Sequence, residues 1–70
     1  MTHHDVLKDK DYNLVSTLYH ALQGAETAET YMKDAQGQGD QELQGYFEEV
    51  QKQYTELANR AKGLLSKRIG

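Results

Sequence analysis

The sequence of 70 residues contains neither cysteine nor proline. Without cysteine there are no disulfides, thiolate metal ligands or cysteine nucleophiles, so packing alone must hold the protein together. Without proline, nothing interrupts a helix. No apolar run approaches the roughly 20 residues of a membrane-spanning helix, and the N-terminus lacks the apolar core of a signal peptide. We therefore expect one small cytoplasmic domain with no membrane partner.

An excess of positive charge is also lacking. The formal net charge is -3 and the pI is near 5.5, so the sequence offers no basic patch for a nucleic-acid backbone. Its clustered cations, Lys62, Lys67 and Arg68, fall in the last turns of a predicted helix, where they complement the negative end of the helix dipole. We expect no nucleic-acid partner.

Motifs of catalysis are missing as well. The sequence has no glycine-rich phosphate loop and no metalloprotease motif. Serine occurs only at Ser16 and Ser66, and no histidine lies near either in the spacing of a nucleophile and its base. We therefore expect that the protein is not an enzyme.

The strongest pattern runs from Asp40 to Lys67. Its apolar residues recur alternately every four and three residues, as in the seam of a coiled coil. In heptad notation, position a holds Phe47, Tyr54 and Ala61, and position d holds Leu43, Val50, Leu57 and Leu64. The pattern predicts a helix over residues 40–67 with an apolar seam that needs a partner.

A second apolar stripe predicts a helix over residues 11–36. Its members are Leu14, Leu18, Ala21, Leu22, Ala25, Ala28, Met32 and Ala35. Small residues in its middle would let a neighbouring helix approach closely. Gly24 lies there and costs about 1 kcal/mol relative to alanine inside a helix, so we expect it to have a packing role.

Residues 36–40 predict a tight turn between the two helices. The turn holds two glycines, one suited to end the first helix in a left-handed conformation, and Asp40 is suited to cap the second. So short a connection makes the helices antiparallel neighbours. Residues 1–10 are polar and are expected to form a flexible N-terminal arm.

One hairpin cannot cover both apolar stripes. We therefore predict an all-α protein in which two antiparallel two-helix hairpins dimerise into a four-helix bundle. The residues expected in the core or at the dimer interface are Leu14, Leu18, Leu22, Met32, Leu43, Phe47, Val50, Tyr54, Leu57 and Leu64.

The segments from Leu18 to Tyr31 and from Leu43 to Val50, with the glycine-aspartate turn between them, resemble the small bacterial ferritin-like domains, in which a helical hairpin forms half of a four-helix bundle. The similarity covers roughly residues 12 to 65. It implies the ferritin-like bundle and a dinuclear iron or manganese centre built from glutamates and Glu-x-x-His motifs.

The sequence departs from that metal motif, because the second helix contains no histidine. The remaining candidate ligands are Glu26 and Glu29, with His20 about two turns upstream. Duplicated by a two-fold axis, these carboxylates could offer oxygen ligands to a divalent ion. Alternatively, Glu29 reaches solvent or bonds to a neighbouring side chain.

Another candidate metal site lies at the N-terminus. A histidine occupies the third position whether the initiator methionine stays (His3) or is removed (His4). A free amine, two backbone amides and this imidazole can bind copper(II) or nickel(II) in a square plane. The simpler interpretation is two histidines in a flexible arm.

These observations leave three functional hypotheses. The first is a non-enzymatic homodimeric protein of ferritin-like type without a cofactor, acting as a protein-binding or scaffold module. The second is a degenerate ferritin-like protein that binds iron or manganese through the carboxylates of the first helix. The third is an adaptor that donates its helices to the bundle of a larger partner.

Overall fold

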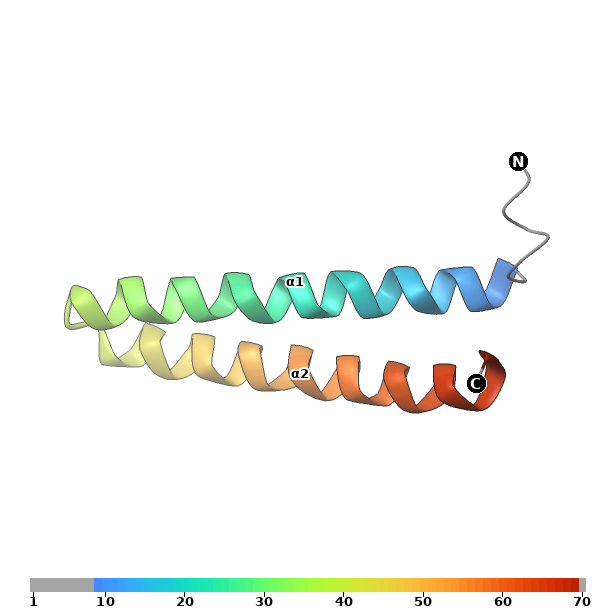
Figure 1. Cartoon of the computed structure of the whole chain (residues 1–70). Coiled ribbons are helices and arrows are strands. Elements are labelled where there is room, and N and C mark those ends of the chain that lie inside the picture. The colour runs from blue at the N-terminus through green and yellow to red at the C-terminus, as the bar shows by residue number, and fades with distance from the viewer. Residues whose placement is uncertain (1–8, 70) are drawn as a thin grey trace.

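The computed structural model describes residues 9–69, which form two long antiparallel helices, α1 (Asp9–Gly37) and α2 (Gln41–Ile69) (Figure 1). The helices pack along their length, and this confirms the predicted all-α hairpin. Helix α1 begins two residues earlier than predicted, so Asp9 and Lys10 belong to the helix rather than to an arm. The rest of the predicted arm, residues 1–8, lies outside the described residues.

The turn closes as the local sequence predicts. Gly39 has a φ of 72°, the left-handed conformation that favours glycine. The Asp40 amide donates to the Ala35 carbonyl (2.9 Å) and the Gly39 amide donates to the Gln36 carbonyl (3.1 Å), the pair of bonds that defines a Schellman motif. The Asp40 carboxylate then accepts a hydrogen bond from the Leu43 amide at 3.1 Å, so Asp40 caps α2.

The interior of the hairpin is built mainly from alanines. On α1 the buried apolar residues lie seven positions apart, so they form one line facing α2. Almost every buried apolar side chain among the described residues is small: Ala21, Ala28, Ala35, Ala58, Ala61 and Leu65. The two helices therefore bury little apolar surface per residue against each other.

In the structure, α2 is rotated about its own axis compared with the orientation in which the whole predicted seam would face α1. Phe47, Tyr54 and Ala61, the predicted position a, do face α1. The second row facing α1, however, is Gln44, Gln51, Ala58 and Leu65. Position d, which holds three leucines and a valine, lies outside this row. The small side chains of α1 draw α2 close, and a row containing alanine fits that approach better than a row of leucines.

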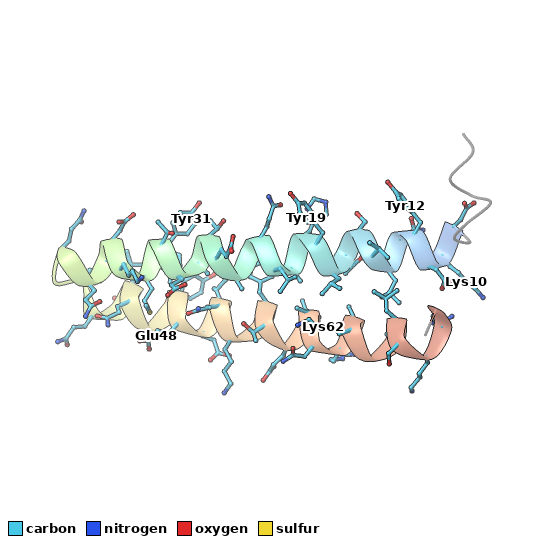
Figure 2. The ribbon with its side chains drawn as sticks, viewed as in Figure 1. Lys10, Tyr12, Tyr19, Tyr31, Glu48 and Lys62 are labelled. Carbon is cyan, nitrogen blue, oxygen red and sulfur yellow. The ribbon has the colours of Figure 1, made fainter. Side chains whose placement is uncertain are left out.

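Aromatic side chains fill the space where the helices are not lined by alanine. The Tyr54 ring lies against Gly24, which confirms that this glycine has a packing role. About two helical turns nearer the loop, the rings of Tyr31 and Phe47 meet edge to face across the helices at 5.4 Å between centroids. By contrast, Tyr12 and Tyr19 project from α1 on the side away from α2 (Figure 2).

The start of α1 and the end of α2 lie side by side at the open end of the hairpin. Asp11, in the first turn of α1, is 8% exposed. The Arg68 guanidinium lies 3.8 Å from its Oδ1 atom. This partly buried ion pair joins the start of α1 to the end of α2.

Candidate functional site

The most prominent surface feature is a line of apolar side chains along α2. Leu43, Val50, Leu57 and Leu64 recur every seven residues, so they lie along one side of the helix, and we call them the outer stripe. Val50 is partly buried. The three leucines remain 46%, 46% and 43% exposed in chain order. An aligned row of exposed leucines is typical of an interface rather than of a solvated surface.

Hollows beside the outer stripe show which side of the hairpin it occupies. Leu64 shares a hollow with Asn13 and Thr17 of α1, and Leu43 shares one with Asp34. The outer stripe therefore lies on the same side as a polar row of α1. We call this side of the hairpin the groove face.

A central hollow of about 540 Å³ occupies the middle of the groove face. Helix α1 contributes His20, Gln23, Gly24, Thr27, Ala28 and Tyr31, and α2 contributes Tyr46, Phe47, Val50 and Tyr54. The lining holds hydroxyl, amide and imidazole groups beside aromatic rings, and it contains no carboxylate, lysine or arginine side chain. The aromatic rings and Val50 that α2 contributes suit contact with another helix.

The opposite side of the hairpin, the back face, carries a shorter apolar row. Successive helical residues are turned by about 100°, which puts Leu22 about 160° from His20 of the groove face. Leu22 is 44% exposed, and Val15 continues its row toward the N-terminus. Glu29 interrupts the row, because its carboxylate pairs with the Lys33 ammonium at 3.5 Å.

The predicted metal ligands of α1 do not come together in one chain. His20 and Glu29 are nine residues apart, a rotation of about 900°, so they lie on opposite sides of the helix. Glu26 is exposed. Between residues 9 and 69, no three histidine, aspartate or glutamate side chains are grouped closely enough to hold a metal ion.

Two of the predicted metal sites involve residues outside the described range or a second chain. His3 and His4 lie outside the described residues. The site formed by Glu29 and its copy across a two-fold axis stays a prediction, since it depends on a second chain.

The residues predicted for the core or the dimer interface fall into two classes. Partly buried are Leu14, Leu18, Met32, Phe47 and Val50. Exposed are Leu22, Leu43, Tyr54, Leu57 and Leu64. The hairpin alone therefore leaves half of the predicted interface uncovered.

Neither α1 nor α2 contains a stretch apolar enough to cross a lipid bilayer. Comparison of the chain with protein-family models, with curated proteins and with solved structures finds no match. The arguments that follow therefore rest on the residues and geometry of the hairpin.

Proposed function

We propose that this chain is a non-enzymatic protein that acts by association: two hairpins form a homodimeric four-helix bundle that serves as a protein-binding or scaffold module. The observation that supports this most strongly is the exposure of Leu43, Leu57 and Leu64 beside an interior made mainly of alanine. The ferritin-like type of the bundle rests on the sequence resemblance alone.

The physical reason is that the hairpin covers mainly small apolar side chains and leaves several large ones exposed. Burying a leucine side chain fully is worth roughly 1.5–3 kcal/mol, whereas an alanine offers a single methyl group. The hairpin buries most of its alanines and leaves four of its leucines, Leu22, Leu43, Leu57 and Leu64, nearly half exposed. A second hairpin can cover those leucines, and burying them would stabilise both copies together.

The dimer would keep a surface for a further protein. Tyr19 projects from α1 away from α2 and is 57% exposed (Figure 2). Tyrosine is enriched at protein interfaces, because its ring can be buried while its hydroxyl keeps a hydrogen bond. A scaffold role uses such outward side chains after the apolar faces have been covered.

Sedimentation equilibrium of the full chain tests the proposal. We expect a mass of twice 8.0 kDa at high micromolar concentration. Helical circular dichroism should fall as dilution separates the copies, because folding and association are coupled. A monomer that keeps its full helical signal across the whole concentration range would contradict the proposal.

A further inference from the structure

We propose that the second copy binds on the groove face by laying its α2 antiparallel on α2, with the two-fold axis passing between Gln53 and Tyr54. This inference rests on the proposed self-association and names the surface and the register. Four observations support it: the spacing of the outer stripe, the distribution of charge along α2, the difference in polarity between α1 and α2, and the contrast between the two faces of the hairpin.

The outer stripe is symmetric about the proposed axis. Leu43 and Leu64 are equally distant from the midpoint between residues 53 and 54, and so are Val50 and Leu57. An antiparallel pair of α2 helices therefore places Leu43 against Leu64 of the second copy and Val50 against Leu57. The stripe is about 32 Å long at 1.5 Å per residue, so the contact extends over most of the helix.

The distribution of charge along α2 favours the same antiparallel arrangement. Residues 40–49 contain four acidic side chains and no basic one: Asp40, Glu42, Glu48 and Glu49. Residues 60–68 contain four basic side chains and no acidic one: Arg60, Lys62, Lys67 and Arg68. The antiparallel pair brings each acidic segment beside a basic one. A parallel pair would align like charges, which are destabilising across a helix interface.

The difference in polarity between the two helices favours packing of α2 on α2 of the second copy. The row of α1 that lines the groove face is polar and includes Thr17, His20 and Thr27. In an alternative dimer the outer stripe of one copy would pack on α1 of the other. Leucines would then be buried against these polar groups, and the polar groups would lose their hydrogen bonds to water. Pairing the two outer stripes avoids that cost.

The back face offers a poorer surface for a second copy. Its apolar row on α1 contains Val15 and Leu22 but continues with Glu29, whose carboxylate pairs with Lys33. Covering this row would bring a partly buried charge into the interface. The outer stripe has no such interruption over its four positions.

Single-cysteine variants test the register, because the natural chain contains no cysteine. Residue 53 lies beside the proposed axis, so the two copies of a Gln53→Cys variant are offset by only about 1.5 Å along the helices. The two copies of an Arg60→Cys variant are offset by roughly 20 Å, far beyond the distance that a disulfide spans. Both positions lie on the same line of α2, seven residues apart.

Under mild oxidation we expect the Gln53→Cys chain to form a covalent dimer and the Arg60→Cys chain to remain uncrosslinked, with sedimentation showing that both still dimerise. A parallel register would crosslink both variants equally. Equal crosslinking, or crosslinking of the Arg60→Cys chain alone, would overturn the proposed register.

A matched pair of substitutions tests the face. Leu57 and Leu22 are 46% and 44% exposed, on the groove face and the back face respectively. We expect Leu57→Glu to raise the dissociation constant of the dimer by about 100-fold or more, because two charges enter the interface. Leu22→Glu should change it by less than about threefold, as expected for a surface site away from the contact.

The outcomes separate the two proposals. A dimer that is broken by Leu22→Glu and tolerates Leu57→Glu would overturn the groove-face assignment while leaving self-association intact. A wild-type chain that is monomeric would contradict the proposed function itself. If Leu57→Glu unfolds the chain, the crosslinking pattern of the cysteine variants still decides the register.

Discussion

The ring of Tyr54 lies directly against the backbone of Gly24: a Cβ atom built on Gly24 would stand 2.7 Å from Cε1 of Tyr54 and 2.8 Å from Cδ1 and Cζ. Real Cβ atoms do not approach a ring so closely. The glycine therefore gives the tyrosine its place between the helices, at the level where the small residues of α1 are concentrated. The contact also fixes which part of α1 lies opposite the centre of α2.

Gly24→Ala should destabilise the protein even though alanine is the better helix former. The substitution gains about 1 kcal/mol in helix propensity, but it forces the Tyr54 ring out of its place, and such overpacking costs about 1–3 kcal/mol. We expect a net loss of about 1 kcal/mol in urea unfolding at fixed protein concentration. Gly45→Ala is the control, since no atom lies within 4 Å of its added methyl group, and it should stabilise by about 0.5–1 kcal/mol.

The two residues should be strongly coupled in a double-mutant cycle. In a Tyr54→Ala background the ring is absent, so Gly24→Ala should become stabilising by about 0.5–1 kcal/mol, like Gly45→Ala. A cost for Gly24→Ala that persists without the ring would show that another contact, and not Tyr54, requires the glycine.

The destabilisation caused by a substitution at Gly39 should depend on how well the new residue tolerates the left-handed backbone conformation. With a φ of 72°, Gly39→Ala should cost about 1 kcal/mol, and Gly39→Asn should cost less, because asparagine tolerates this conformation. Gly37 provides the comparison: it lies at the end of α1 with open space around it. Gly37→Ala should leave the unfolding midpoint unchanged or raise it. Equal effects of alanine at both positions would argue against the Schellman turn.

Arg68→Ala should destabilise more than Lys67→Ala. Both residues are basic side chains in the last turn of α2, so both lose a similar interaction with the helix dipole. Removal of Arg68 also removes its ion pair with the buried Asp11 carboxylate, at a cost of about 1–2 kcal/mol. Thermal unfolding of the two variants measures the difference, and an Asp11→Asn background should reduce it. Equal melting temperatures would mean that the ion pair is not formed.

Manganese(II) or iron(II) should leave the melting temperature unchanged. His20 and Glu29 lie on opposite sides of α1, and residues 9–69 contain no group of three metal ligands in one chain. The measurement is made with His3 and His4 replaced by alanine, so that the N-terminus binds no metal. Stoichiometric metal that is lost on Glu29→Ala would contradict this expectation and show that two copies build the site.

The sequence predicts the hairpin well because the signals at its turn are local. Gly39 ends α1 and Asp40 caps α2 through bonds to residues three to five positions away, and these interactions need no knowledge of the tertiary fold. The pairing of Asp11 with Arg68 also follows from the turn, since the two residues are nearly equally far from it along the chain.

The orientation of α2 could not be predicted from hydrophobicity alone. The leucines of the outer stripe give a stronger apolar signal than the row of Gln44, Gln51, Ala58 and Leu65, yet this row faces α1. Side-chain size decides the contact, because helices lined by alanine approach closely, and the one leucine of this row, Leu65, lies near the open end of the hairpin. The separation of His20 from Glu29, in contrast, was available from helical geometry at 100° per residue.

The alanine interior also limits how this protein can change over evolutionary time. At Ala21, Ala28, Ala58 and Ala61, every replacement other than glycine enlarges a side chain that is at most 4% exposed. A neighbouring alanine cannot be replaced by a much smaller residue to compensate. The usual exchange, in which one residue becomes larger and its neighbour smaller, is therefore not available to this hairpin. In a random mutational library these four sites should tolerate fewer substitutions than Leu22 on the back face, an inversion of the ordinary ranking by residue size.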